Sequence, residues 1–299
     1  MNTQTCTGFK VIKAGFQASI QDAGRFGYQQ FGLATSGALD DVSYEWANKL
    51  LGNADNAAVL EIPYGHVTLV ANAATRIVIT GANLGATCNG KPVLRYQPLQ
   101  INAGDKIEFH QAQTLDGVRA YLGVDGGFQT EEFWGSRSVN FREGIGRAIQ
   151  VEDCLPFSPT TEEKEAPYFP QSELTEYLEF GDVVTLRLLP AHQFYDFDEA
   201  QRQAFFKQTF EASNEFDRTA CRLIAEQEIK PPYTQMVSQG MTPGTVQIPP
   251  SGHPIIMLKD HPTIGGYPKI GTVIAKDLAK LAQSQPRQKL HFKLVSLRN

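Results

Sequence analysis

A glycine-rich, charged segment near the C-terminus is the first candidate for chemistry. Residues 245–258 predict a hairpin, because an alternating run is followed by a Pro-Pro-Ser-Gly turn and an unbroken apolar run. Asp260 ends this hairpin, and four residues suited to contacting a ligand follow it closely: Gly265, Gly266, Tyr267 and Lys269. Since glycine has no Cβ, backbone and cation can approach a ligand together. We therefore expect a site here, with Gln247 on the first strand of the hairpin.

A second candidate is the glycine-dense stretch at residues 21–27, which includes Gln21 and Gly24. Glycine at this density indicates a chain that passes through tight or left-handed turns. Asp22 and Arg25 offer an acceptor and a bidentate donor within reach of each other. A mutual ion pair that only holds the loop explains the same pattern at least as well.

Two further loops place glycine beside arginine, at residues 135–138 with Arg137 and at residues 144–147 with Arg147. Backbone amides and guanidinium groups in such loops can hold an oxyanion. Glycine turns between strands look the same, so each loop has a purely structural alternative. The sequence has neither the phosphate-binding loop of P-loop enzymes nor a complete dinucleotide-binding fingerprint.

Arg218 and Arg222 are four residues apart and would share one face if their segment were helical. In that case they could clamp a carboxylate or a phosphate. A solvated surface with ion pairs would show the same residues and is the commoner outcome.

A helix is predicted at residues 41–51, with Gly52 as its stop. Asp40 and Asp41 at its start indicate capping, because two carboxylates there would repel a phosphate. Asn48 and Glu61 are polar positions that fit either caps or ligand contacts.

Composition limits the class of protein. The chain has 299 residues, 41% of them hydrophobic and 20% charged, as in globular proteins. A net charge of -5 and a pI near 5.7 argue against a nucleic-acid partner. Neither a leader pattern nor an apolar run long enough for a membrane span is visible, so we expect a cytoplasmic protein. Four widely spaced cysteines predict reduced thiols and no metal site.

The elements that must position these residues are mainly β. Short strand patterns recur at residues 67–70, 76–80, 106–110, 118–124, 183–189 and 289–295. Two more helices are expected at residues 199–210 and 273–282. A stretch rich in Pro, Thr and Glu at residues 156–175 predicts a connector between an N-terminal domain, residues 1–155, and a C-terminal domain, residues 176–299.

Together these motifs resemble one known family. They occur, in its order, at residues 21–27, 37–40, 48–53, 124–128, 135–138, 244–249 and 265–269. The family is the C subunit of bacterial 5-oxoprolinase, also described as KipI antagonist, allophanate hydrolase subunit 2 and biotin-dependent carboxyltransferase-like. The resemblance covers residues 16–292 and implies a mainly β fold with few helices, built as two cyclophilin-like β-barrel domains with a cleft between them.

The resemblance also implies a function. With a KipI-like B subunit and a lactam-binding A subunit, such a chain would hydrolyse 5-oxo-L-proline to L-glutamate, with ATP and Mg²⁺ as co-substrate. Alternatives are a regulatory antagonist that binds a KipI-like kinase inhibitor, and a carboxyltransferase that moves a carboxyl group from biotin to a urea-like substrate. The methionines flank no lysine in the manner of a biotin carrier, so we expect no covalent biotin.

Residue roles follow as hypotheses. We expect catalytic roles for Asp22, Arg25, Asp260 and Lys269, with the two carboxylates orienting water or holding Mg²⁺. We expect substrate or nucleotide contacts from Gln21, Gly24, Asn48, Glu61, Arg137, Arg147, Arg218, Arg222, Gln247, Gly265, Gly266 and Tyr267. No resident metal site is expected. The segment at residues 217–223 lacks a glycine of the family pattern, and His261 stands where the family often has arginine.

Overall fold

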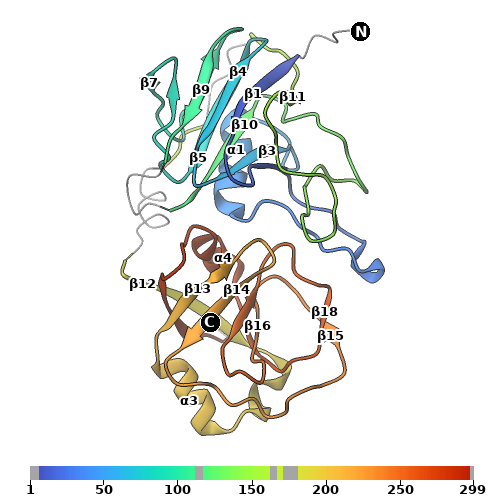
Figure 1. Cartoon of the computed structure of the whole chain (residues 1–299), viewed down its shortest axis with the longest axis vertical. Helices are drawn as coiled ribbons and strands as arrows, with labels where there is room; N and C mark the ends of the chain where they lie inside the picture. Colours follow the sequence, from blue (N-terminus) through green and yellow to red (C-terminus); the bar gives the residue numbers. More distant parts are fainter. Residues whose placement is uncertain (1–6, 112–116, 162–166, 171–180, 297–299) are drawn as a thin grey trace. The chain divides into compact units, whose positions relative to one another are not determined.

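The computed structural model describes residues 7–111, 117–161, 167–170 and 181–296 (Figure 1). The chain divides into two compact units, which we describe separately. Unit 1 comprises Met1–Arg25 and Asp40–Glu179, and unit 2 comprises Phe26–Leu39 and Phe180–Asn299. Residues 26–39, which lie inside the N-terminal domain expected from the sequence, therefore belong to unit 2.

The strands of unit 1 form two sheets that share one apolar core. The first has the order β11-β1-β4-β9-β6-β7, made of β1 (Gly8–Ala14), β4 (Val67–Ala71), β6 (Thr87–Cys88), β7 (Lys91–Pro92), β9 (Lys106–Phe109) and β11 (Cys154–Pro156). The second has the order β2-β3-β10-β5-β8, made of β2 (Ser19–Gln21), β3 (Val59–Pro63), β5 (Thr75–Gly81), β8 (Leu99–Ile101) and β10 (Arg119–Val124). Buried side chains of both sheets, including Phe9 and Leu122, pack in a single cluster. Burial of this apolar surface stabilises the unit.

Helix α1 (Asp41–Leu51) has the bounds that the sequence predicted. The Asp40 carboxylate accepts hydrogen bonds from the Ser43 amide at 3.0 Å and from the Ser43 hydroxyl at 2.7 Å. Gly52 ends the helix in the left-handed conformation, at φ 69°. The capping role proposed for Asp40 is therefore confirmed.

Unit 2 is a closed barrel of seven strands in the order β12-β19-β16-β17-β14-β13-β20. Its strands are β12 (Val183–Pro190), β13 (Phe210–Phe216), β14 (Ala220–Ala225), β16 (Thr245–Gln247), β17 (Ile255–Met257), β19 (Lys269–Val273) and β20 (Lys289–Leu294). Strand β12 pairs in parallel with β20 and antiparallel with β19. The predicted hairpin is confirmed as β16 and β17. With α1, α3 (Glu199–Lys207) and α4 (Ala275–Ala282), the described chain is mostly β with three α-helices, which confirms the mainly β class with few helices and one of the two expected barrels.

Three details differ from the sequence predictions. Helix α3 ends at Lys207, and Phe210 begins β13, because its ring packs with Phe205 and Phe292 in the barrel core. Phe157, in the expected connector, is buried in the core of unit 1. Cys154 takes part in a disulfide bond, so the expectation of reduced thiols is wrong there.

A helix that could cross a membrane is absent from the described residues.

Candidate active site

Lys269 and Gln247 face each other on neighbouring strands of the unit 2 barrel. Lys269 begins β19 and Gln247 ends β16, and the two residues are paired in the strand register. Lys269 is 8% exposed and Gln247 is 3% exposed. The register therefore holds an ammonium and a carboxamide side by side in a largely buried position.

A short two-stranded sheet lies against this pair. Strand β15 (Gln239–Gly240) pairs with β18 (Ile264–Gly265). The Lys269 ammonium donates a hydrogen bond to the Gly240 carbonyl oxygen at 2.7 Å. A Cβ on Gly265 would lie 2.5 Å from Nε2 of Gln247, so glycine at this position permits the close approach.

The Lys269 ammonium is a buried charge with little compensation. Among the described residues it makes no ion pair, and Gly240 supplies its one hydrogen-bond acceptor. Desolvation lowers the pKa of Lys269 below 10.5. Such a cation can stabilise negative charge on a bound oxygen, because water screens it poorly.

Gln247 and the glycine loop complete the group in unit 2. The Gln247 amide Nε2 lies 3.4 Å from the Tyr267 carbonyl oxygen, a long and weak hydrogen bond. Tyr267 is 38% exposed. Gly266 follows Gly265 directly, and a Cβ on it would lie 3.2 Å from the Met236 carbonyl oxygen. Five predicted residues thus come together: Gln247, Gly265, Gly266, Tyr267 and Lys269.

Asp260 lies in a buried ion pair with Arg218. Its carboxylate accepts from Nε of Arg218 at 3.0 Å and from Nη2 at 3.2 Å. Nη2 also donates to the Gly37 carbonyl oxygen at 2.6 Å, which ties the segment Phe26–Leu39 to unit 2. Asp260 is 1% exposed and Arg218 is 6% exposed. This geometry favours a positioning role for both side chains.

Arg222 does not share a face with Arg218. The helical possibility is wrong, because the segment is a β-hairpin in which Arg222 lies on β14 and Arg218 precedes that strand. Arg222 is exposed and pairs with Glu215 at 2.7 Å. The two arginines therefore cannot act as one clamp.

Asp22 in unit 1 is surrounded by hydrogen-bond donors. Oδ1 accepts from the Gly24 amide at 2.8 Å, the Ser136 hydroxyl at 2.7 Å and the Ser138 hydroxyl at 2.5 Å. Oδ2 accepts from the Arg137 amide at 2.6 Å. This arrangement clamps residues 136–138 and leaves Asp22 little capacity to activate water.

Arg25 and Gln21 brace the same loop. Nη2 of Arg25 donates to the Ser138 carbonyl oxygen at 2.6 Å, and Arg25 is 1% exposed. Nε2 of Gln21 donates to the Val139 carbonyl oxygen at 3.2 Å. Asp22 and Arg25 therefore both bind the loop from 136 to 139, which replaces the mutual pair considered from the sequence.

Asn48 and Glu61 have protein partners in unit 1. Asn48 donates to the Ala57 carbonyl oxygen at 2.9 Å and accepts from Asn53 at 3.1 Å. Glu61 accepts from the Tyr121 hydroxyl at 2.9 Å, and burial raises the pKa of Tyr121 well above 10. These contacts support the structural alternative for both residues.

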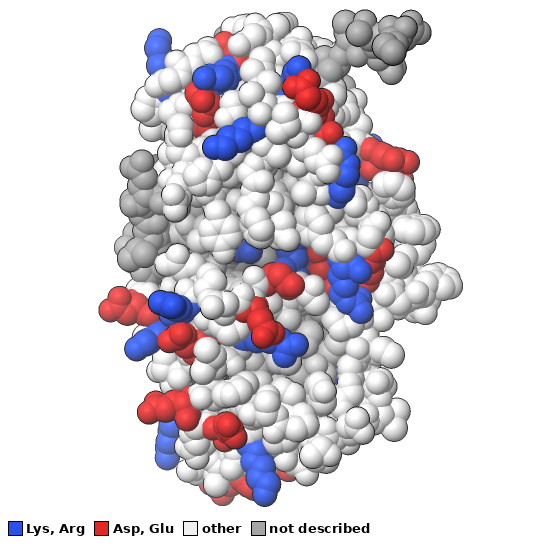
Figure 2. All heavy atoms as spheres, in the orientation of Figure 1, with Lys and Arg blue, Asp and Glu red and all other residues white. Residues whose placement is uncertain are grey.

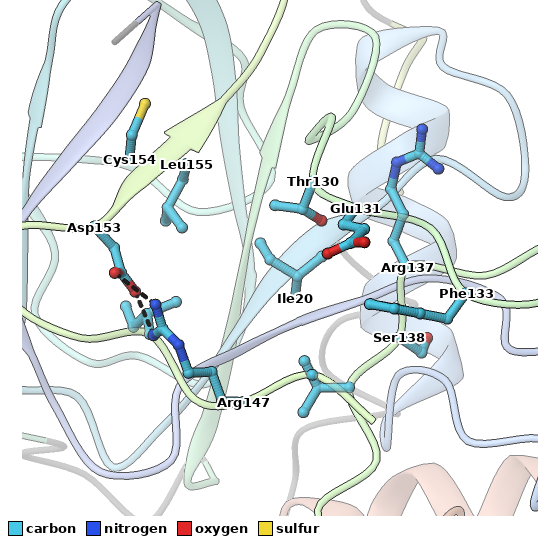
Figure 3. A pocket seen from close by; sticks show the side chains of 13 residues that line it. Ile20, Thr130, Glu131, Phe133, Arg137, Ser138, Arg147, Asp153, Cys154 and Leu155 are labelled. Atoms are coloured by element: carbon cyan, nitrogen blue, oxygen red, sulfur yellow. Dashed lines mark hydrogen bonds and ion pairs between the residues drawn. The ribbon is translucent and has the colours of Figure 1, made fainter. Parts of the chain in front are cut away.

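The two glycine-and-arginine loops meet at one pocket of about 460 Å³ in unit 1 (Figure 3). Arg147 forms a bidentate pair with Asp153 at 2.7 and 2.8 Å, which raises the pKa of Arg147 and lowers that of Asp153. Arg137 pairs with Glu132. Both guanidinium groups are therefore already engaged by carboxylates.

Two residues that contribute to the site around Lys269 were not predicted from the sequence. Gly240 supplies the acceptor for Lys269, and Gln193 donates to Oε1 of Gln239 at 2.8 Å beside it. Oε1 of Gln193 is buried without a hydrogen-bond partner. No sequence pattern indicated either residue, because Gly240 lies in a strand of only two residues and Gln193 lies in a short 3-10 helix, His192–Asp196.

Charge is mixed in sign. Lys and Arg are interspersed with Asp and Glu over the face drawn in Figure 2. Within the described ranges, no group of three or more His, Cys, Asp or Glu side chains could hold a metal ion.

Comparisons with known proteins define the family. A family model described as carboxyltransferase domain, subdomain A and B, matches residues 31–294. The chain is 32% identical to the 5-oxoprolinase C subunit of Escherichia coli and 34% identical to that of Haemophilus influenzae, and each match covers 96% of this chain and 91% of the relative.

Solved structures agree. The structure of TTHA0988 matches with a TM-score of 0.87 at 30% identity, over 98% of this chain and 57% of that one. The Kluyveromyces lactis urea amidolyase matches with a TM-score of 0.88 at 25% identity, over 97% of this chain and 19% of that one. Our chain thus corresponds to only part of each of these longer proteins. It belongs to the carboxyltransferase-domain family, subdomains A and B, which includes the C subunit of 5-oxoprolinase.

Proposed function

We propose that this chain is a subunit of an ATP-dependent 5-oxoprolinase that opens 5-oxo-L-proline to L-glutamate. In this proposal it acts with a KipI-like B subunit and a lactam-binding A subunit. Its similarity to two C subunits of 5-oxoprolinase over nearly their whole length supports the role. The single structural observation that carries it is the buried ammonium of Lys269, which has one hydrogen-bond acceptor and no ion pair among the described residues, beside the Gln247 amide.

The amide of Gln247 matches the chemistry of a lactam. A five-membered lactam presents its N–H and C=O on the same side of the ring. A carboxamide presents one acceptor and one donor side by side and can pair with both. Lys269 then supplies the positive charge that the carbonyl oxygen needs as it gains negative charge.

The overall reaction consumes ATP and two waters. The γ-phosphoryl group moves from ATP to the lactam oxygen, and ADP leaves. Water adds to the carbon, the ring C–N bond breaks, and the nitrogen takes up a proton. A second water hydrolyses the resulting acyl phosphate to glutamate and phosphate. Positioned cations lower the barrier by stabilising charge on the moving oxygens.

Neither Asp22 nor Asp260 fits a Mg²⁺ site. Asp22 accepts four hydrogen bonds from the protein, and Asp260 is paired with Arg218. Mg²⁺ is therefore proposed to enter with the nucleotide, as part of the co-substrate. Asp22, Arg25 and Asp260 become positioning residues, and Lys269 remains the catalytic candidate.

The test is a reconstituted three-subunit assay. Glutamate release from 5-oxo-L-proline is measured with and without ATP, using the unmodified chain, Lys269→Met and Lys289→Met. Lys289 is an exposed lysine on β20 and serves as the matched control. We expect ATP-dependent release that Lys269→Met abolishes and Lys289→Met retains. Glutamate release that persists with Lys269→Met would contradict the catalytic role of Lys269. An absence of glutamate release with the unmodified chain would contradict the proposed function.

Carboxyl transfer is the second candidate, favoured by the family model and by the match to urea amidolyase. Here the carboxyl group would move from a carboxybiotin carrier to a urea-like nitrogen, with biotin regained. Incubation of the chain with a carboxylated biotin carrier and urea distinguishes the two reactions. Labelled carboxyl transfer without ATP favours this candidate, and its absence together with lactam opening favours the first.

A further inference from the structure

One carboxylate that lines the unit 1 pocket makes no ion pair among the described residues, although the other charged groups there are paired. Arg147 is bound to Asp153, and Arg137 is bound to Glu132. Glu131 also lines the pocket and makes no ion pair with any described residue. After the two pairs cancel, the pocket carries one negative charge. A highly charged anion such as a triphosphate is therefore disfavoured, and a cation is favoured.

The remaining surface of the pocket is largely apolar. The Glu131 carboxylate points toward Ile20 in Figure 3, and Leu155 lies on the opposite wall from Arg137. Ile20 and Leu155 are 4% exposed and belong to the core of unit 1. A ligand here needs an apolar stem as well as a positive end, which is the composition of a lysine side chain.

Two exposed apolar residues lie on tight turns, close in sequence to lining residues of the pocket. Trp134 is 50% exposed at φ 52°, in a turn closed by the Phe133 and Ser136 bridge. Val151 is 55% exposed, next to Glu152 at φ 74°. The left-handed conformation is costly for tryptophan. Exposed aromatic and apolar residues around a pocket are typical of protein interfaces.

We propose that this pocket docks a lysine side chain of a partner polypeptide. The ammonium binds Glu131, the methylene stem packs on Ile20 and Leu155, and residues flanking the lysine cover Trp134 and Val151. The negative charge of Glu131, which remains after the two ion pairs cancel, favours a cation. The exposed apolar residues Trp134 and Val151 favour a polypeptide over a free amine. This docking does not depend on the proposed reaction.

The test is calorimetric titration of the full chain with acetyl-Leu-Lys-Leu-amide. We expect saturable binding that is weakened about five-fold or more in Glu131→Gln and when norleucine replaces lysine. Glu152→Gln, an exposed glutamate outside the pocket that pairs with Lys10, should bind like the unmodified chain. Circular dichroism checks that each variant is folded.

Specific outcomes overturn the proposal. If the norleucine peptide binds as tightly as the lysine peptide, the pocket recognises only apolar surface. Unchanged binding in Glu131→Gln places the lysine elsewhere. If n-butylammonium binds as tightly as the peptide and Trp134→Ala weakens neither, the pocket serves small amines and no polypeptide. An absence of saturable binding to the unmodified chain contradicts the proposal outright.

Discussion

Asp22 in unit 1 and Lys269 in unit 2 are both buried charges without an oppositely charged side-chain partner among the described residues. They differ in hydrogen bonding. Four protein donors surround Asp22, whereas a single carbonyl oxygen contacts Lys269. A buried charge that the protein has fully satisfied holds structure, and one that it has left partly unsatisfied is available to a ligand. The comparison separates two residues that the sequence had placed in one catalytic set.

The largest expected effect is that of Lys269→Met on activity. We expect the turnover of the reconstituted complex to fall about 100-fold or more, because a preorganised charge at a developing oxyanion is lost. The folding stability of Lys269→Met should not fall together with its turnover. Since desolvation lowers the pKa of Lys269, the unfolded chain binds its proton more tightly, and burying the charged amine costs stability below the folded-state pKa.

Because burying the charged Lys269 amine costs stability, the stability difference between the unmodified chain and Lys269→Met should depend on pH. Stability of the unmodified chain should rise with pH between the folded-state pKa and 10.5, so any stability advantage of Lys269→Met shrinks over this window. Urea unfolding at pH 7 and pH 10 measures it. A strong loss of stability at pH 7 would place Lys269 in the structural class with Asp22.

Asp22→Ala should have the next largest effect, this time on stability. Removing the carboxylate leaves two buried amides and two hydroxyls without their acceptor, which we expect to cost about 3 kcal/mol. Urea denaturation of the full chain measures the change. Ser136→Ala removes one of the four donors and should cost about 1 kcal/mol. Similar values for the two variants would contradict the clamp.

Gly265→Ala should lower activity by about tenfold, because its Cβ would displace the Gln247 amide by contact at 2.5 Å. The Cβ would also meet Sδ of Met241 at 2.6 Å. Stability should change little, since both contacts are with the ends of flexible side chains. Gly240→Ala is the matched control in the paired strand, because its Cβ would meet no atom within 4 Å. Equal activity in both variants would show that the Gln247 position is unimportant.

The smallest effect is expected for Arg222→Gln. The Arg222 and Glu215 side chains are 53% and 74% exposed, so their ion pair is screened by water. We expect a change in stability within about 0.5 kcal/mol and no change in turnover. A loss of activity comparable to that of Lys269→Met would return Arg222 to the site.

Much of the local structure could be predicted from the sequence. The bounds of α1 followed from its apolar spacing, from Asp40 at its start and from Gly52 at its end. The β16 and β17 hairpin followed from alternation and turn residues. Segment 213–222 was ambiguous, because spacing by four fits a helix or a hairpin until the partner strands are known.

By itself the sequence determined the family, the mainly β class and the residues able to do chemistry, because these depend on residue type and short-range order. Tertiary structure alone decided how those residues are used. Pairing of β16 with β19 brought Gln247 to Lys269, and residues 136–138 closed on Asp22 from more than a hundred positions away. Burial and hydrogen-bond saturation set the availability of a charge, and both are created by contacts between segments distant in the chain.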